Sequence, residues 1–340
     1  MKAIRAHAFG GPENLVLDDV PTPEPGPSDV LIEIRAAGVN PADTYMLTGN
    51  YAITTDLPYI PGGDCAGLVV SVGSGAEAFT PGDRVFVSAA LGRAMSGCYA
   101  EFVVRPAANV MPLPANVGFA EAAALGVPYV TAHFALFTRG RAQAGETVFI
   151  HGASGAVGTA AIQLARRAGL KVIGSAGSDA GLQQISAEGV DLAVDHTKPG
   201  YLDAVHLATG GTSPALILEM LANENLAADM DLAPQNGRIV IIGCRGDISI
   251  SPRMAMLKEL DILGTAIWNA PHDKVKTVLE DISAGLADGS LKPVIGRTYP
   301  LAEAAESHRK VLRAGATGKI ILAPSSKPSL EDLENRKITP

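Results

Sequence analysis

The feature that most limits the fold of this chain is a glycine-rich turn placed between an expected strand and an expected helix. The turn reads His-Gly-Ala-Ser-Gly-Ala-Val-Gly over residues 151–158 and follows the apolar, β-branched run Thr147–His151. Small and apolar residues at helical spacing come after it. Ala153, Gly155 and Gly158 take the three places of the G-x-G-x-x-G pattern, with alanine in the first place. Such a pattern permits a tight turn and a close approach of backbone to a phosphate group.

Five further apolar runs repeat the alternation of strand and helix after this turn. The expected strands are Lys171–Ser175, Asp191–Asp195, Leu216–Glu219, Arg238–Gly243 and Ile262–Ile267. Strands that alternate with helical segments at this spacing are typical of an α/β fold with a doubly wound parallel sheet, the Rossmann fold.

In a chain with 37 glycines, the turn by itself is also compatible with a plain small-residue turn. Its position between the first of six strands and a helix favours dinucleotide binding, because free N–H groups at a helix N-terminus attract a pyrophosphate. We expect that pyrophosphate to lie on Ala153, Ser154, Gly155, Ala156, Val157 and Gly158.

The end of the second expected strand bears on which dinucleotide binds. Folds specific for NAD usually carry an acidic residue there, about 20 positions after the turn, to bind the ribose hydroxyls. Here the strand ends Ser175-Ala176-Gly177 with no carboxylate. The small neutral residues leave room for a 2′-phosphate, so we predict NADPH. The nearby Asp179 argues mildly against this preference.

The first third of the chain reads as β-rich, and the last part is expected to return to it. The Pro-rich stretch Pro21–Pro27 is expected to link the first two strands. We predict a β-rich catalytic domain of residues 1–122 and 269–340 around a Rossmann domain of residues 123–268, with a loosely ordered tail at Pro324–Pro340. The expected strands of the first third are Lys2–His7, Val30–Ala36, Ala66–Val72, Arg84–Val87 and Tyr99–Val104. The expected elements after the sheet are helices at Asp273–Ala287 and Leu301–Ala314 and a strand at Lys319–Leu322.

Composition narrows the class of protein further. No run approaches the ~18 consecutive apolar residues of a membrane-spanning helix, and the start lacks the apolar region of a secretory signal, so a cytoplasmic location is expected. A net charge of −8 without a basic stripe disfavours a nucleic-acid partner. Cys65, Cys98 and Cys244 form no metal-binding pair, and each is expected to be a buried, inert thiol.

Several runs also carry a family resemblance. They are AGVNPADTY at 37–45, LPYIPGGDCAG at 57–67, the glycine turn, EMLANENL at 219–226, IIGCRGDISISPR at 241–253, LKPVIGRTYPL at 291–301 and GATGKIIL at 315–322. Together they resemble the zeta-crystallin-like quinone oxidoreductases of the medium-chain dehydrogenase/reductase superfamily. The resemblance implies a GroES-like catalytic domain beside the Rossmann domain, and reduction of small quinones by NADPH.

The zinc alcohol dehydrogenases of the same superfamily supply a contrast. They bind catalytic zinc through a cysteine and a histidine, at places that read Asn40 and Gly63-Asp64 here. Neutral asparagine and glycine cannot replace thiolate and imidazole, and residues 87–99 lack the four cysteines of a structural zinc lobe. We therefore predict no metal. A quinone accepts hydride readily, so positioning and a hydrogen-bond donor or two suffice.

The resemblance also implies individual site residues. Tyr45 and Asn40 are the expected catalytic, orienting groups, and Tyr51 and Thr131 the expected substrate contacts, with Tyr45 and Thr131 also beside the nicotinamide. The other expected cofactor contacts are Gly177 and His196 at the ribose with the 2′-phosphate, and Asn225, Ile242, Gly243, Cys244, Arg245, Thr265, Ala266 and Ile267 along the remainder.

Each of these side chains has an ordinary structural alternative. Tyr45 is also compatible with half-buried packing, and Tyr51 and His196 with a place on the solvated surface. A threonine in a helix, such as Thr131, often bonds only to its own backbone.

Two other functions stay open from the sequence. One is NADPH-dependent reduction of an enone or alkenal double bond, and the other is a zeta-crystallin-type NADPH- or RNA-binding protein with little turnover. The resemblance further implies a homo-oligomer, dimer or tetramer, in which an exposed edge at Gly264–Trp268 pairs with its copy.

Overall fold

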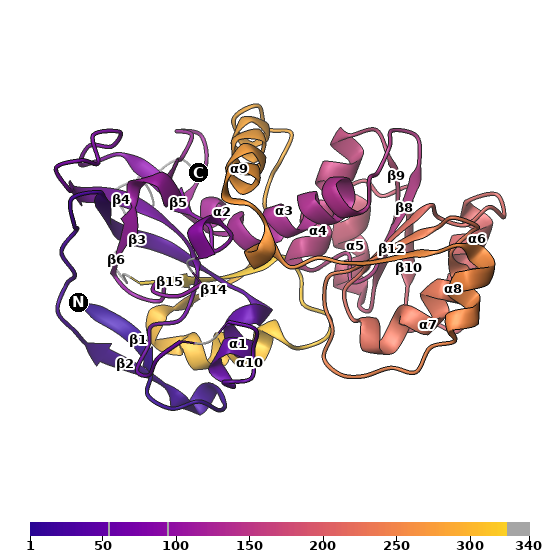
Figure 1. Cartoon of the computed structure of the whole chain (residues 1–340), viewed down its shortest axis with the longest axis horizontal. Helices are drawn as coiled ribbons and strands as arrows, with labels where there is room; N and C mark the ends of the chain where they lie inside the picture. The colour runs from indigo at the N-terminus through magenta and orange to yellow at the C-terminus, as the bar shows by residue number, and fades with distance from the viewer. Residues whose placement is uncertain (54, 94, 325–340) are drawn as a thin grey trace, which may run out of the picture.

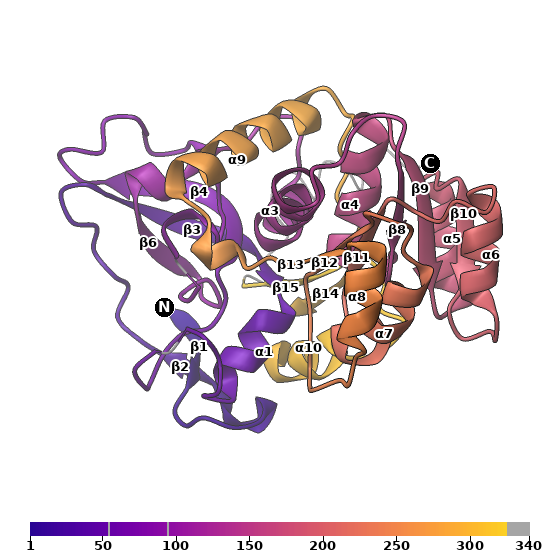
Figure 2. The same ribbon diagram turned by 45° about the vertical axis from the view of Figure 1, so that its right-hand side comes forward.

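The chain folds around two large β-sheets, one parallel and one mainly antiparallel. The computed structural model describes residues 1–53, 55–93 and 95–324. The strands of the first third and the last strands (indigo and yellow in Figure 1) lie on one side of the molecule, and the middle of the chain lies on the other. Figure 2 shows the same division from a second direction, with α9 (His272–Ala287) above both parts.

The middle of the chain forms a six-stranded, wholly parallel sheet. Its strand order is β10-β9-β8-β11-β12-β13, so the order reverses at β8, as it does in a doubly wound sheet. This confirms the predicted α/β Rossmann architecture. The strands are β8 (Thr147–Ile150), β9 (Lys171–Ala176), β10 (Leu192–Asp195), β11 (Leu216–Glu219), β12 (Arg238–Ile241) and β13 (Asp261–Gly264).

Helices cover both faces of this sheet, because successive strand residues point to opposite sides. Val148 and Ile150 pack in one core cluster with α3, α4 and α5, whereas Phe149 packs with α6, α7 and α8 on the other face. These helices are α3 (Gly126–His133), α4 (Ala156–Arg167), α5 (Asp179–Ala187), α6 (Tyr201–Ala208), α7 (Ala222–Leu232) and α8 (Pro252–Lys258).

The second sheet has seven strands and draws them from both ends of the chain. Its order is β14-β15-β3-β4-β5-β7, and β6 pairs with β3. The chain returns after the Rossmann sheet because β15 pairs antiparallel with β3. The strands are β3 (Asp29–Val39), β4 (Asp64–Val72), β5 (Arg84–Val87), β6 (Phe102–Pro106), β7 (Met111–Pro112), β14 (Ile295–Pro300) and β15 (Lys319–Ala323).

Shorter elements complete this side of the molecule. A hairpin-like pair, β1 (Lys2–Ala6) with β2 (Leu15–Asp19), forms a separate small sheet. The helices here are α1 (Pro41–Leu47), α2 (Phe119–Ala123) and α10 (Ala304–Val311). None of the helices in the described part of the chain is long and apolar enough to cross a membrane.

Several expected boundaries are wrong. The run Ile262–Ile267 stops being a strand at Gly264, and Ile267–Asn269 is a 3-10 turn. The run Tyr99–Val104 becomes a strand only at Phe102. The expected helix Leu301–Ala314 begins as a 3-10 turn and ends at Val311.

Three strands were not expected at all: β2, β14 and β7, which has only two residues and so gives no strand pattern. β2 reads LVLDD and β14 reads IGRTYP, and charges, glycine and proline within such short runs weaken a strand pattern. As a result, Pro21–Pro27 follows the second strand rather than the first. The expected tail, apart from Pro324, lies outside the described residues.

The three thiols are not alike. Cys65 and Cys98 are buried, as expected, but Cys244 is exposed, so its expected burial is wrong. Cys244 stands in the turn after β12, which ends at Ile241.

Candidate active site

The carboxyl edge of the parallel sheet, where all six strands end, gathers most of the residues predicted to bind the cofactor. The glycine turn leads from β8 into α4, which begins at Ala156 with Gly155 as its N-cap. No side chain of the described residues caps this N-terminus. Its first N–H groups have no partner within the helix and therefore remain available to an anion.

Two glycines of the turn have different roles. A Cβ on Gly158 would lie 2.5 Å from the Cα of Ala153, so glycine is needed for helix and turn to pack. A Cβ on Gly155 would meet only the Gly152 carbonyl oxygen, at 3.4 Å. Gly155 therefore leaves open the face of the turn that a ligand would approach.

The tip of β9 carries the next pair of predicted residues. A Cβ on Gly177 would lie 2.4 Å from Nε2 of His196, so the imidazole rests directly against this glycine. His196 Nδ1 lies 3.4 Å from Ser175 Oγ. Burial lowers the pKa of His196, which keeps the ring neutral at pH 7. The structure thus brings together the two residues expected at the ribose.

The turns after β11 and β12 interlock along the same edge. Ile242 N donates a hydrogen bond to Glu219 O at 2.8 Å. A Cβ on Gly243 would lie 2.3 Å from Met220 O, so the two turns are in direct backbone contact. Asn225, in α7, donates from Nδ2 to Glu219 Oε1 at 3.2 Å.

The remaining predicted cofactor residues stand just beyond β12 and β13. Cys244 Sγ is 3.0 Å from Gly246 O and is exposed. Thr265 N donates to Ile241 O at 3.0 Å, which holds the segment Thr265–Ile267 beside β12 although it is no longer a strand. Ala266 precedes the 3-10 turn, and Ile267 is buried within it.

The two predicted tyrosines lie in one aromatic cluster, formed by Tyr45, Tyr51 and Trp268. The ring centroids of Tyr45 and Tyr51 are 5.8 Å apart, and those of Tyr51 and Trp268 are 5.2 Å apart, edge to face. Arg245 Nε donates to Tyr45 Oη at 3.2 Å. Because Arg245 follows β12, this bond joins the aromatic cluster to the carboxyl edge.

Asn40, the other predicted catalytic residue, belongs to a buried polar network. It is the N-cap of α1 and is only 2% exposed. Its Nδ2 donates to Asp64 Oδ2 at 3.0 Å, and its Oδ1 accepts from the ammonium group of Lys319. Lys319 is also 2% exposed, and its Nζ lies 3.6 Å from Asp64 Oδ2. The amide of Asn40 is thus fixed by an ion pair behind it.

The network extends from Asp64 and Asn40 in two directions. Asp64 also accepts from the backbone N–H groups of Ala89 and Val127, at 2.9 Å each. Thr131, the predicted substrate contact, is buried one helical turn after Val127 in α3. This spacing places the side chains of Val127 and Thr131 on the same face of α3.

Asp43 forms the second branch. Its Oδ2 accepts from Asn40 N and from Tyr99 Oη, both at 2.8 Å. Tyr99 Oη is in turn 3.3 Å from His308 Nε2. Burial raises the pKa of Asp43 to about 7 and lowers that of His308 to about 4. The imidazole is therefore neutral at pH 7, and this branch holds α1 in place without a second buried positive charge.

Sequence reasoning missed Asp64, Lys319 and Trp268 as parts of this site. The sequence places Asp64 only beside a lost zinc ligand, and Lys319 only at the start of an expected strand within the run GATGKIIL. A lysine in a strand flanked by apolar residues is the one signal that marks Lys319, because such a residue is seldom buried without an anionic partner.

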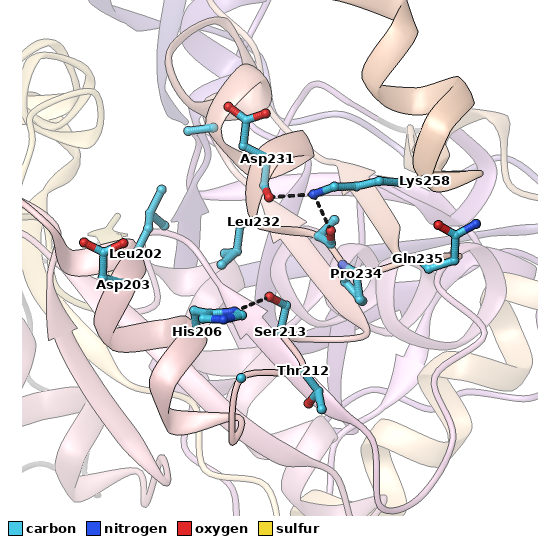
Figure 3. A pocket seen from close by; sticks show the side chains of 13 residues that line it. Leu202, Asp203, His206, Thr212, Ser213, Asp231, Leu232, Pro234, Gln235 and Lys258 are labelled. Carbon is cyan, nitrogen blue, oxygen red and sulfur yellow. Dashed lines mark hydrogen bonds between the residues drawn. The ribbon is translucent and has the colours of Figure 1, made fainter.

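One sizeable hollow in the described part of the chain lies away from this site. It measures about 760 Å³ and is lined by side chains of α6, α7 and α8 (Figure 3). Residues 211–213 and 233–235, which precede β11 and β12, also line it, so it lies at the amino ends of these strands. Lys258 fills part of it by donating to the carbonyl groups of Asp231 and Ala233, at 2.6 and 2.8 Å. Ligands of open α/β sheets bind at the opposite, carboxyl end. We therefore assign no role in the reaction to this hollow.

Comparisons with known proteins agree with the architecture. Residues 26–115 match the family model of the alcohol dehydrogenase GroES-like domain, and residues 156–284 match that of zinc-binding dehydrogenase. The quinone oxidoreductase of Rattus norvegicus is 44% identical over 324 residues, which span 95% of this chain and 97% of that protein.

Two solved structures extend the comparison. An NAD-dependent alcohol dehydrogenase is 32% identical with a TM-score of 0.89, over 96% of this chain and 100% of that one. A mycobacterial protein in complex with NADPH is 26% identical with a TM-score of 0.86, over 95% and 100%. The predicted resemblance is confirmed: the chain belongs to the quinone oxidoreductase family of the medium-chain dehydrogenase/reductase superfamily.

Proposed function

We propose that this protein reduces small quinones with NADPH. The observation that carries the proposal is the bond from Arg245 to Tyr45, because it brings an aromatic cluster to the edge where the glycine turn ends. Flat aromatic side chains suit a flat quinone ring. The names of the 41–44% identical relatives, all quinone oxidoreductases, support the same reaction.

The carboxyl edge fits a dinucleotide. The uncapped first turn of α4 would hold the pyrophosphate, and Gly177 with His196 would hold the ribose and its 2′-phosphate. NADPH supplies a hydride when it is bound. The tip of β9 carries no carboxylate to repel a 2′-phosphate, and the 26% identical mycobacterial structure contains NADPH.

The remaining contacts would run along the same edge. Asn225, the turn Ile242–Arg245 and the segment Thr265–Ile267 follow the ends of β11, β12 and β13 in turn. Tyr45 and Thr131 would lie nearest the nicotinamide.

Tyr45 and Asn40 would orient the reacting groups. Reduction places negative charge on a quinone oxygen, and a fixed hydrogen-bond donor stabilises that charge. The Tyr45 hydroxyl is such a donor at the surface of the aromatic cluster. One proton of the Asn40 amide group is donated to Asp64, and this bond fixes the direction in which the second amide proton points. Tyr51 and Thr131 would contact the quinone.

The residues at the expected zinc positions do not fit a metal. Asn40 and Asp64 both bind the Lys319 ammonium group, so a buried positive charge already stands between them. A divalent cation beside this ammonium would be repelled. The proposed reaction therefore proceeds without metal.

We also propose the domain division of 1–122 with 269–340, and 123–268. The two large sheets share no strand, and this supports the division.

We propose a cytoplasmic location. Two neighbouring buried thiols, Cys65 and Cys98, support it because free thiols persist in reducing compartments.

We propose a homo-oligomer built on the free edge of β13. This strand ends the sheet order, and α8 beside it exposes Met256 (68%) and Leu257 (61%). An open strand edge with apolar neighbours favours pairing with a copy of itself. Static light scattering is expected to give two or four times the 35.0 kDa chain mass, and a 35.0 kDa species at micromolar concentration would contradict the proposal.

An absorbance assay of nicotinamide oxidation tests the reaction. NADPH and NADH would be compared with a benzoquinone, phenanthrenequinone and an alkenal, with a chelator present throughout. We expect NADPH-linked turnover of the quinones that the chelator does not change. Turnover of the alkenal alone would indicate double-bond reduction instead. Tight NADPH binding with no turnover would favour a binding protein.

Tyr45→Phe provides the matched variant for this assay. It keeps the ring of the aromatic cluster and removes only the hydroxyl that Arg245 contacts. We expect kcat to fall by about 10²-fold, a typical loss for one donor at a developing oxyanion, with little change in NADPH affinity. Unchanged kcat would remove Tyr45 from the catalytic role.

A further inference from the structure

A second group of buried titratable side chains lies just below the carboxyl edge and has no part in the reaction proposed above. His151 follows β8, Glu219 ends β11 and Asp229 belongs to α7; their exposed fractions are 3%, 0% and 0%. His151 Nε2 lies 2.8 Å from Asp229 Oδ1 and 3.3 Å from Glu219 Oε2. Three separate elements therefore place two carboxyl groups and one imidazole together in the interior.

This group, here named the buried triad, has more acidic than basic members. In the described part of the chain, the ion pairs of Glu219 and Asp229 are with His151 alone. Glu219 Oε2 and Asp229 Oδ2 make no hydrogen bond. Two ionised carboxylates here would be strongly unfavourable, and a proton held within the triad removes one of the charges. Burial accordingly raises the pKa values of Glu219 and Asp229 to about 7 and lowers that of His151.

The buried triad is connected to three segments of the carboxyl edge. His151 begins the glycine turn, and the next residue, Gly152, donates from its N–H to Ser175 Oγ at the tip of β9 (3.3 Å). Glu219 Oε1 accepts from Leu221 N and from Asn225 Nδ2 at the start of α7. The triad thus supports the glycine turn and the start of α7 from the interior of the protein.

We propose that His151, Glu219 and Asp229 are positioning residues that share protons and hold the glycine turn and the start of α7 in the arrangement that binds NADPH, so that affinity falls when the triad loses a proton. The proposal rests on the proposed function, because it takes NADPH to bind at this edge. When the triad loses a proton, it gains a negative charge that repels the phosphates of NADPH. The same charge changes the hydrogen bonds between Glu219 and the start of α7. In the part of the chain that the structure describes, His196, after β10, and Tyr201, in α6, also face the triad.

The test is the pH dependence of NADPH affinity, measured by fluorescence titration at pH 6, 7 and 8. For the wild type we expect Kd to rise about tenfold over this range, the effect of one proton on one site. Glu219→Gln keeps an oxygen for Leu221 N but cannot ionise, so we expect its Kd to change less than about threefold over the same range. Asp229→Asn is the second variant in case the first does not fold.

Two controls separate other sources of pH dependence. Glu224→Gln removes a charge from the exposed side of the same helix, α7, and is expected to keep the wild-type slope. NADH lacks the 2′-phosphate, which itself titrates near pH 6, so the slope due to the protein must be present with both nucleotides.

The possible failures are distinguishable. Equal pH slopes for the wild type and for folded Glu219→Gln and Asp229→Asn would overturn the proposal. Absence of NADPH binding at every pH would instead contradict the proposed function. A histidine with two carboxyl groups could also bind a metal ion, and equilibrium dialysis with Zn²⁺ alone tests for that. One zinc bound per wild-type chain, and none in Glu219→Gln, would assign the triad to a cation and overturn the proton-sharing proposal.

Discussion

Gly155→Ala is expected to weaken NADPH binding about 30-fold without unfolding the protein, because the added methyl group stands where the backbone must approach the pyrophosphate. In the structure a Cβ at this position meets only one carbonyl oxygen, at 3.4 Å, so the fold accepts it. Gly158→Ala is expected to act on stability instead of directly on NADPH binding. Its Cβ would lie 2.5 Å from backbone, and the free energy of unfolding should fall by about 2–3 kcal/mol.

Fluorescence titration with NADPH and urea unfolding separate these two effects. Gly75→Ala is the control, because its Cβ would meet only Pro27 O and Ser28 Oγ, at 3.4 and 4.0 Å, far from the carboxyl edge. It should leave both affinity and stability unchanged. If Gly155→Ala bound NADPH as tightly as the wild type, the pyrophosphate could not lie on the glycine turn.

Lys319→Met is expected to lower the free energy of unfolding by about 3–5 kcal/mol, the usual result of removing one partner of a buried ion pair. The substitution leaves Asp64 charged in the interior, with three hydrogen-bond donors but no cation. It also releases the Oδ1 of Asn40, so quinone turnover should fall together with stability.

The double variant Lys319→Met with Asp64→Asn is the matched control. Removing both charges should recover about 2 kcal/mol relative to Lys319→Met alone, because no unpaired charge remains. Urea unfolding followed by circular dichroism measures the three stabilities under one condition. A double variant less stable than Lys319→Met would mean that Asp64 does not depend on the lysine for its charge balance.

The parallel sheet was predictable because each of its features is local. Apolar runs of four to six residues, separated by helical segments and opened by a glycine turn, are sufficient to predict β8 to β12. The end of β13 was not predictable, because Thr265–Ile267 stays apolar after the strand pairing stops. β2 and β14 were not predicted because their charges, glycine and proline weaken the strand pattern. These segments are strands because they pair with neighbouring strands.

The cofactor edge of the candidate site was also predictable from local patterns, since the carboxyl ends of parallel strands lie at one edge of the sheet. The contacts between the two halves of the site were not predictable in this way. Arg245 reaches Tyr45 across 200 residues, and Lys319 reaches Asn40 across 279. Only the family resemblance pointed to Asn40 and Tyr45, and nothing in the residues themselves indicated Lys319 or Trp268 as their partners.

The pairing of β15 with β3 has a consequence for the order of folding during synthesis. The Rossmann strands β8 to β13 are complete once residue 264 has emerged, so their sheet can close while translation continues. The central strand of the other sheet, β3, must wait for residues 319–323. From residue 39, the end of β3, to residue 323 the ribosome adds 284 residues, which takes about 15–60 s at roughly 5–20 residues per second. During this time the end of β3 that pairs with β15 is open to other chains. Binding of a ribosome-associated chaperone to the nascent chain would be most useful in this window.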